Sequence, residues 1–381
     1  MPLYDVAIVG GSHPDVVERV TTALRRAAEA FGLEWETDFR VQPGVGRFTP
    51  DPSSASVVVV MGGADSVNIA LEGVYDTSRI PAIPVASTAK AVANEIPPAL
   101  RPLNCAFLDT EGASDRIASS ILACVGLLPQ QRRTFLSYRR EASTPVAVQL
   151  FEALSERQFD VFLDTHSINV AETFQEALWH QLCDADVLLM LETDGYFASR
   201  WTAAEYGRAL AKCIGVVRVT WPDATPNAIT GTASRVELLA EELRPDGTLE
   251  PAAVDRILLQ VEQMRVLSHA VRHRSLVDNF GEAVTLIGGR VTAVGPHRSM
   301  HVELATGEAL LVQPMIGVPT SVTLHDAIER AGPLEAAILF DHLGIRPSWL
   351  AHLDWLATSV ARARWVKSNE AAWTLAGWGT G

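Results

Sequence analysis

The chain has 381 residues, which at about 150 residues per domain is enough for two or three domains. Its 31 Lys and Arg against 45 Asp and Glu give a net charge of −14, which argues against a protein that coats nucleic-acid backbones. Small anions must therefore be bound in specific pockets. A hydrophobic fraction of 48% and a charged fraction of 20% are typical of a chain that is folded throughout.

The first residues carry no basic stretch ahead of their apolar run, and no apolar stretch approaches the roughly 20 residues that a membrane helix needs. The four cysteines are far apart and form no CxxC pair, which argues against a disulfide framework. We therefore expect a cytoplasmic protein with neither a membrane nor a nucleic acid as partner.

Two histidines, His269 and His273, have the four-residue spacing that places side chains on one face of a helix. No HExxH pattern accompanies them, and the neighbouring arginines would repel a cation. We therefore expect no metal in the chain.

The first third of the chain alternates between β-branched runs and amphipathic segments, which predicts a parallel sheet covered by helices on both faces. In chain order we expect a strand over 4–9, a helix over 14–31, a strand over 57–60, a helical turn over 66–73 and a strand over 80–85. Glycine turns follow two of these strands, at positions 10–12 and 61–63. Because ligands bind beyond the carboxyl ends of parallel strands, both turns are candidate pocket walls.

A second alternating series begins after Pro129 and the polar run 130–133, which predict a linker. We expect strands over 134–138, 159–164, 186–192 and 215–221, and helices over about 145–157, 171–183, 201–213 and 250–275. This pattern predicts a second parallel sheet.

After Asn279 the pattern becomes rich in β-strands. We expect strands over 284–294, 299–304, 309–315 and 336–340, and helices over 323–331 and 347–364. The tryptophans of this region have spacings typical of core-filling side chains, and we assign the region no chemistry. The expected fold class is α/β, with doubly wound parallel-sheet domains over 1–128 and 133–278 and a smaller α+β region over 279–381.

The middle region carries three motifs in a specific order: FLSYRR at 135–140, FDVFLD at 159–164, and a WxxxE pattern from Trp201 to Glu205. With the segments 174–178 and 186–189 between them, these motifs closely resemble those of TIR domains over about 133–275. The resemblance implies a flavodoxin-like fold. Within that family the chain resembles the branch that cleaves the nicotinamide–ribose bond of NAD⁺, rather than the branch that scaffolds signalling complexes.

Glu205 is the candidate catalytic residue. Cleavage at the ribose anomeric carbon passes through an oxocarbenium-like transition state, which a nearby carboxylate stabilises. Nicotinamide leaves as a neutral molecule, so neither a second carboxyl group nor a metal is needed, and NAD⁺ is a substrate rather than a cofactor. Trp201, one helical turn earlier, would shield the carboxylate and contact a ring of the substrate. The alternative is a Trp that packs its helix beside a solvated Glu.

Three further candidates follow the first strand of the motif series. Tyr138, Arg139 and Arg140 should lie at the ligand edge of the sheet, where guanidinium groups bind pyrophosphate or ribose hydroxyls. A surface ion pair is the alternative for one of the two arginines.

The resemblance to TIR domains assigns two more residues to the substrate pocket, Asp164 and Phe174, although a turn cap is the alternative for Asp164. It also identifies 165–173 with the BB loop of the family, which implies assembly into a homo-oligomer through TIR contacts. The sequence NVAE at 169–172 departs from the Pro-Gly or Gly-Glu pair common there, which puts the geometry of assembly in doubt.

Three short motifs mark the N-terminal region: VGGS at 9–12, MGGAD at 61–65 and IPVAST at 83–88. In this order they resemble the SLOG superfamily over about 1–128, particularly the version fused to sirtuin-type or TIR effectors in bacterial antiviral defence. Glycine-turn N–H groups bind anions, so we expect a nucleotide-derived ligand. The expected ligand contacts are Gly10, Gly11, Ser12, Gly62, Gly63, Asp65, Ser87 and Thr88.

Relatives of this fold that hydrolyse nucleotides carry PGGxGTxxE, whereas this chain reads MGGADSVNIALE. We therefore expect the region to bind without hydrolysis, and the alternative is a domain that only packs or oligomerises. The sequence predicts an NAD⁺ glycohydrolase activated by a nucleotide ligand and by self-assembly. The alternatives are an NAD⁺ cyclase that makes a cyclic ADP-ribose messenger and a non-enzymatic TIR adaptor.

Overall fold

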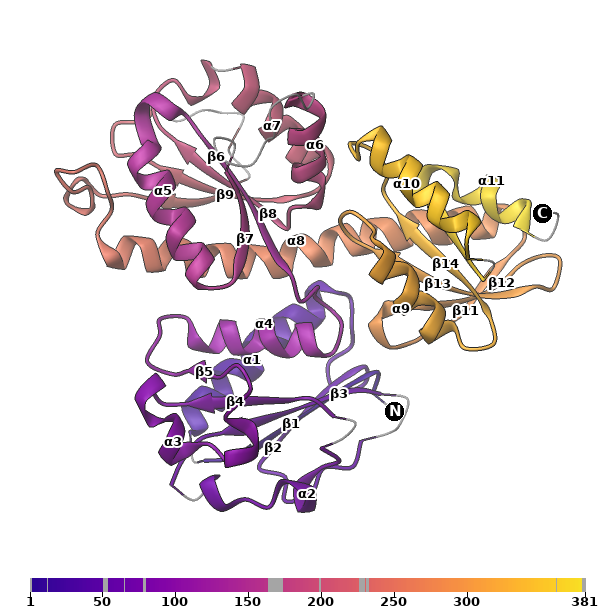
Figure 1. The fold of residues 1–381 in the computed structure, drawn as a ribbon, viewed down its shortest axis with the longest axis horizontal. Coiled ribbons are helices and arrows are strands. Elements are labelled where there is room, and N and C mark those ends of the chain that lie inside the picture. Colours follow the sequence, from indigo (N-terminus) through magenta and orange to yellow (C-terminus); the bar gives the residue numbers. More distant parts are fainter. Residues whose placement is uncertain are drawn as a thin grey trace. The chain divides into compact units, whose positions relative to one another are not determined.

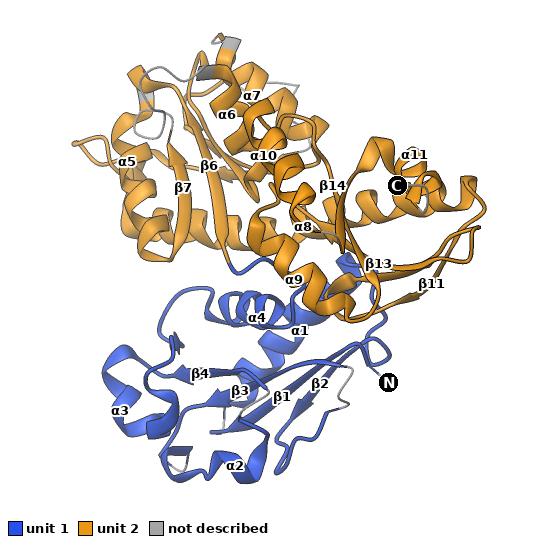
Figure 2. Ribbon diagram, turned by 45° about the vertical axis from the view of Figure 1, so that its right-hand side comes forward, with its two compact units in different colours: residues 1–130 blue, residues 131–381 orange. Residues whose placement is uncertain are grey.

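The computed structural model describes residues 2–11, 13–50, 54–64, 66–77, 80–163, 174–198, 200–225, 230, 233–360 and 362–378. The chain divides into two compact units, residues 1–130 and 131–381, which are coloured separately in Figure 2. The described residues form three five-stranded sheets, of which two are entirely parallel and the third is mixed. This arrangement confirms the expected fold class.

Unit 1 contains the first sheet, with strand order β2-β1-β3-β4-β5. Its elements are β1 (Tyr4–Gly10), α1 (Pro14–Ala30), β2 (Phe39–Pro43), β3 (Ala55–Met61), α2 (Leu71–Val74), β4 (Ala82–Ala86), α3 (Val92–Glu95), β5 (Ala106–Phe107) and α4 (Ala113–Cys124). The sequence analysis did not predict the edge strand β2, because Arg40 and Gln42 interrupt its apolar pattern. Both side chains bind a residue of the neighbouring strand β1. Asp5 of β1 is completely buried, and its carboxylate accepts hydrogen bonds from Arg40 and Gln42 at 2.5 and 2.8 Å.

Unit 2 contains the middle sheet, with strand order β10-β9-β8-β6-β7. Its elements are β6 (Arg132–Tyr138), α5 (Arg140–Glu156), β7 (Phe159–Leu163), α6 (Phe174–Asp184), β8 (Val187–Glu192), α7 (Arg200–Ala211), β9 (Gly215–Thr220) and β10 (Ser234–Glu237). Helix α5 packs on one face and α6 and α7 pack on the other, each over its own apolar core (Figure 1).

A single helix, α8 (Pro251–Leu286), belongs to two cores (Figure 1). Its first half packs on the α5 face of the middle sheet through residues such as Ile257, and its second half packs on the third sheet through residues such as Phe280. The sequence-based end of this helix at 275, and the strand expected from 284, are therefore wrong. Apolar residues keep the helical period through Val284, so the expected domain boundary at 278/279 lies inside α8.

The third sheet has the order β11-β12-β13-β14-β15, antiparallel from β11 to β13 and parallel from β13 to β15. Its elements are β11 (Arg290–Val294), β12 (Met300–Glu303), β13 (Ala309–Met315), α9 (Ser321–Ala331), β14 (Glu335–Phe340), α10 (Pro347–Thr358), β15 (Ala363–Lys367) and α11 (Ala371–Ala376). The helix expected to reach 364 ends at Thr358, and β15 follows. Trp378 is core-filling, but Trp355 and Trp373 are exposed, which corrects the expectation for these two.

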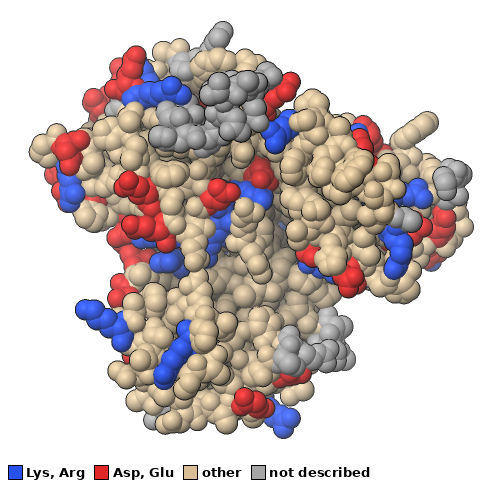
Figure 3. Space-filling view, in the orientation of Figure 1, with Lys and Arg blue, Asp and Glu red and all other residues tan. Residues whose placement is uncertain are grey.

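On the face shown in Figure 3, acidic and basic side chains lie in scattered groups between larger uncharged areas. None of the described helices combines the length and the apolar character that crossing a membrane requires.

The middle of α8 is polar and buried. Arg265, which is completely buried, and His269 hydrogen-bond to the two carboxylate oxygens of Asp186 at 2.9 and 2.6 Å. The N–H of Arg133 reaches the same carboxylate at 3.0 Å. Burial raises the pKa of Asp186, but these partners outweigh burial and hold the pKa well below its usual range. His269 is therefore a partner of Asp186, one residue before β8.

His273, one turn further along α8, is buried, and neither ring nitrogen has a hydrogen-bond partner among the described residues. Burial, together with the nearby Arg298 and His269, lowers the pKa of His273 from 6.5 to about 3. Burial lowers the pKa of His269 as well. Because the unfolded chain binds protons in this window that the folded chain does not, stability is lost as the pH falls from 6.5 towards 3.

We expect the free energy of unfolding to fall by about 1.4 kcal/mol per pH unit for a histidine kept neutral in the fold. His273→Leu should reduce this pH dependence and cost little stability at neutral pH, since it removes an unpartnered polar group. Urea unfolding at pH 7.5 and 5.0 measures both effects. An unchanged difference between the two pH values would exclude His273 as a source of the acid sensitivity.

Candidate functional site

The chain order reverses between β6 and β8, which are neighbours in the middle sheet although β7 lies between them in sequence. In parallel sheets of this type, ligands bind beyond the carboxyl ends of the strands at such a point. Ser137 and Tyr138 end β6, and Glu192 ends β8. Polar groups from both strands therefore meet at this edge.

Helix α7 brings Trp201 and Glu205 to the same edge, one turn apart. The hydroxyl of Ser137 donates a hydrogen bond to Oε2 of Glu205. Glu205 is only 6% exposed, so its carboxylate is buried rather than solvated, while Trp201 is half-buried.

Tyr196 extends this contact into a chain of donors. Its hydroxyl lies 2.5 Å from Oγ of Ser137, and its carbonyl accepts a hydrogen bond from the hydroxyl of Thr202 on α7. Burial, followed by the charge of Glu205, raises the pKa of Tyr196 well above 10, so the phenol stays protonated. Because the proton of Ser137 is directed at Glu205, Tyr196 donates to Ser137. Two successive hydroxyl donors therefore lead to the Glu205 carboxylate.

A second buried carboxylate, Glu192, lies at the same edge and has a cationic partner. Nε of Arg218 in β9 lies 3.0 Å from Oε2 of Glu192, and both side chains are almost fully buried. Burial raises the pKa of Glu192, and Arg218 opposes that shift. The contact between Arg218 and Glu192 is an ion pair without a hydrogen bond, whereas Nη1 of Arg218 donates to the carbonyl of Thr230 at 2.9 Å. Glu192 is thus held by an arginine, whereas the donor that reaches Glu205 from β6 is a neutral hydroxyl.

The last three residues of the FLSYRR motif lie in different settings. Tyr138 is buried in the core beneath α5 and α8, on the face of the sheet opposite Ser137. Arg139 donates to the carbonyl of Asp194 at 3.1 Å and pairs with the exposed Glu141 at 3.0 Å. Arg140 is exposed at the first turn of α5. Arg139 thus forms the surface ion pair that was the alternative for one of the two arginines.

Two expected pocket residues are not fully visible. Asp164 and the segment 165–173 lie outside the described residues, and so does the side chain of Phe174, whose backbone begins α6. Their roles remain predictions.

Sequence reasoning did not single out Ser137, Tyr196, Glu192 or Arg218 as site residues. A signal existed for two of them, because Glu192 is the polar end of an otherwise apolar strand and Ser137 lies within the FLSYRR motif. The pairing of Ser137 with Tyr196 and Glu205 joins positions 59 and 68 residues apart, which no local pattern reveals.

The glycine turns of unit 1 bring neighbouring strand ends close together. An added Cβ would lie 2.4 Å from the carbonyl oxygen of Met61 at Gly10, where φ is +90°, and 2.4 Å from that of Gly62 at Gly11. The N–H groups of Gly11, Gly62 and Gly63 donate to carbonyls of the chain. The premise that these three groups are exposed for an anion is therefore wrong, and close backbone approach accounts for glycine at 10 and 11.

At the end of β4, Ser87 and Thr88 precede a short helical turn, and a carboxylate occupies the donors of Ser87. Glu95 of α3 accepts hydrogen bonds from the N–H and hydroxyl of Ser87 at 2.7 and 2.6 Å. The N–H and hydroxyl of Ser87 therefore bind an anionic group, which is the carboxylate of Glu95 in the same chain. Ser12 and Asp65 lie outside the described residues.

Residues 134–256 match the family model of the TIR domain, so this part of the chain is a TIR domain, as the motifs predicted. No curated protein matches the chain. Matching solved structures include a tagatose-6-phosphate ketose/aldose isomerase from Escherichia coli, at 11% identity over 71% of this chain and 82% of that one, with a TM-score of 0.18. A putative isomerase of the same description from Clostridium novyi NT has 9% identity over 71% and 79%, with a TM-score of 0.19. Likenesses this low carry no argument about fold or function.

We expect Ser137→Ala to destabilise the fold more than Tyr196→Phe. The first removes a hydrogen bond to a buried carboxylate, worth about 1.5–3 kcal/mol, and the second removes one between neutral groups, worth about 0.5–1.5 kcal/mol. Urea denaturation of both variants measures the difference. Equal losses would contradict the direction of the donor chain from Tyr196 through Ser137 to Glu205.

Proposed function

We propose that the TIR domain cleaves the nicotinamide–ribose bond of NAD⁺, with Glu205 as its catalytic carboxylate. The observation that supports this most is the buried Glu205 carboxylate at the switch point of the sheet, held in one orientation by Ser137. The same edge is where parallel sheets bind their ligands.

The chemistry needs a negative charge that is already in place when positive charge develops on the ribose. A carboxylate fixed by hydroxyl donors in a site of low dielectric meets this need without reorganisation during the reaction. Because Tyr196 stays protonated and Glu192 is paired with Arg218, neither adds a competing free charge. Nicotinamide leaves as a neutral molecule, so the site needs no acid to protonate it.

Glu205→Gln should abolish most NAD⁺ cleavage, since loss of one preorganised electrostatic group lowers the rate by on the order of 10²–10³. Glu152→Gln, on the exposed face of α5 in the same domain, is the matched control and should retain full activity. Chromatography of the nicotinamide released measures both. A folded Glu205→Gln protein with the turnover of the control would remove Glu205 from this role.

Two alternatives use the same domain. If water is excluded, an adenine nitrogen of the substrate captures the ribosyl cation and the product is a cyclic ADP-ribose, which product analysis distinguishes from linear ADP-ribose. A non-enzymatic adaptor would leave NAD⁺ intact under every condition. The position of Glu205 at the edge of the sheet where ligands bind favours an enzyme.

Unit 1 is the proposed sensor, in the manner of SLOG domains of bacterial defence proteins. Its ligand would be a nucleotide-derived anion at the carboxyl edge of the first sheet, close to Ser87 and Thr88. The N–H and hydroxyl of Ser87 now donate to the carboxylate of Glu95, and they would become available to a ligand if that carboxylate moved. A phosphate group of the ligand would then take the place of the Glu95 carboxylate, which is also negatively charged. Activation would proceed through homo-oligomers of the TIR domain, with segment 165–173 at the contact.

In this scheme a ligand activates only if it binds the assembled state more tightly, because equal affinity for both states shifts nothing. We expect NAD⁺ cleavage per molecule to rise with protein concentration and with an activating nucleotide, alongside larger species in light scattering. A panel of ADP-ribose-type and cyclic nucleotides supplies the ligands. Specific activity that stays constant across a wide dilution series of a monomeric protein would exclude activation by assembly.

A further inference from the structure

Unit 2 contains a cavity of about 120 Å³ between the end of the α7 helix, α8 and the third sheet. This volume holds more than a single water molecule. None of its lining residues belongs to the Glu205 site or to the motifs of the sequence analysis.

The cavity lies at the carboxyl ends of the parallel strands of the third sheet. Gly317 comes two residues after β13, Asp341 follows β14 directly, and Ser368 follows β15 directly, and all three line it. This is the edge at which parallel α/β sheets bind ligands. We assigned no chemistry to the third sheet from the sequence, yet it has a cavity at the edge where parallel sheets bind ligands.

Three charged side chains line the cavity: the cations Lys212 and Arg272 and the carboxylate Asp341. Lys212 is paired with Asp341 at 2.5 Å. Arg272 of α8 donates to the carbonyls of Ala185 and Cys183 at 2.9 and 3.0 Å, and among the described residues it has no carboxylate within ion-pair distance. Burial lowers the pKa of Arg272, and the nearby charges of Asp186, Asp341 and Asp184 oppose that shift without forming an ion pair with it. Of the charged residues that line the cavity, two are therefore cationic and one is anionic.

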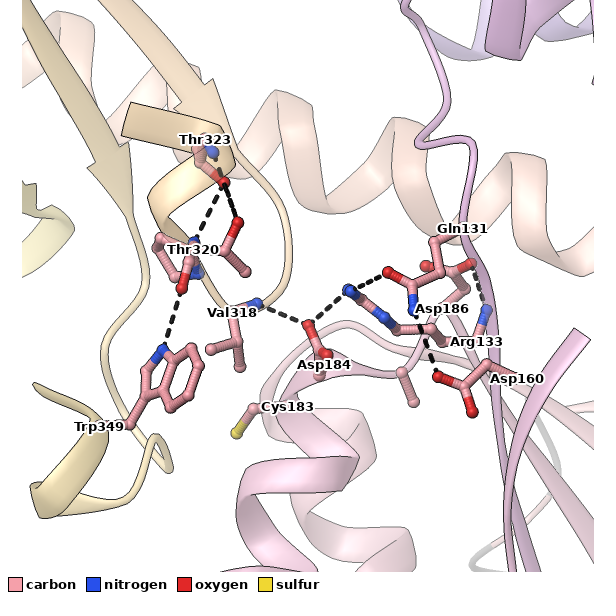
Figure 4. Close-up of polar contacts among 12 residues, drawn as sticks. Gln131, Arg133, Asp160, Cys183, Asp184, Asp186, Val318, Thr320, Thr323 and Trp349 are labelled. Carbon is pink, nitrogen blue, oxygen red and sulfur yellow. Dashed lines mark hydrogen bonds and ion pairs between the residues drawn. The ribbon is translucent and has the colours of Figure 1, made fainter. Parts of the chain in front are cut away.

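Neutral donors complete the lining. Ser275 and Asn279 lie one turn apart on α8, and Ser368 faces them from the end of β15. Hydroxyl and amide donors beside a guanidinium are the groups that bind tetrahedral oxyanions. Asp184 accepts hydrogen bonds from Arg133 and from the N–H of Val318, next to Gly317, which fixes the loop after β13 (Figure 4).

We propose that this cavity binds a phosphate group, with Arg272 as its principal cation and Ser275, Asn279 and Ser368 as donors. The volume fits inorganic phosphate or the phosphate end of a small phosphomonoester. The residues that line the cavity all belong to unit 2 and do not include Glu205, so the proposal stands whether or not the chain cleaves NAD⁺.

Cys213, which is exposed and lines the cavity, reports on occupancy in the full-length protein. Inorganic phosphate at ten times its Kd should slow the alkylation of Cys213 by about tenfold, as expected for a thiol blocked in the bound state. Peptide mass spectrometry measures the rate, with Cys105 and Cys124 of unit 1 as internal references that phosphate leaves unchanged. Sodium chloride at equal ionic strength is the comparison, and it should not protect.

Ser275→Asp places a negative charge in the cavity at an exposed helix position, and protection of Cys213 should then be lost. Ser155→Asp, on the exposed surface of α5, is the matched control and should keep protection. Arg272→Gln should weaken protection at least as much as Ser275→Asp. Absence of phosphate protection in the unmodified chain, or full protection in Ser275→Asp, would overturn the proposal.

Discussion

The buried carboxylate of Asp186 fixes the arrangement of unit 2. It lies at the start of β8 and binds Arg265 and His269 of α8 and the N–H of Arg133 in β6. Removing either α8 partner would leave a desolvated charge incompletely balanced, which costs several kcal/mol in buried ion pairs. The helix is therefore held in one register against the middle sheet. Because the same helix completes the core of the third sheet, that sheet depends on Asp186 as well.

The middle sheet keeps its buried carboxylates in different electrostatic settings at its two edges. At the amino edge, Asp186 has an arginine and a histidine as partners, which suits a structural role. At the carboxyl edge, Glu192 has Arg218, but Glu205 receives its hydrogen bond from the hydroxyl of Ser137. The hydroxyl of Ser137 carries no charge, unlike the guanidinium beside Glu192.

Local patterns in the sequence were sufficient for the central strands of the sheets and most helices, because β-branched runs and helical periods are local properties, but they missed the edge strands β2, β5 and β10. They failed at the end of α8, where the Thr-Leu-Ile run at 285–287 suggested a strand, and at β15, where an amphipathic pattern hid the break after Thr358. The WxxxE pattern correctly placed Trp201 and Glu205 on one helix. Ser137 and Tyr196 were missed because their contacts form only when β6 and β8 become neighbours. The glycines at 10 and 11 were identified, but their tertiary reason, a close approach of strands, was not visible in sequence.

The continuity of α8 also determines how the chain can be divided. The match to the TIR family model ends at residue 256, within the second turn of α8. The matched region therefore lacks most of a helix that the core of the middle sheet needs. A fragment cut there would lose Arg265 and His269 and expose the apolar face that α8 covers. At 1.5 Å per residue its 36 residues form a shaft about 54 Å long. Because this one continuous helix packs against both the middle and the third sheet, the two sheets are joined by a rigid element and not by a loop.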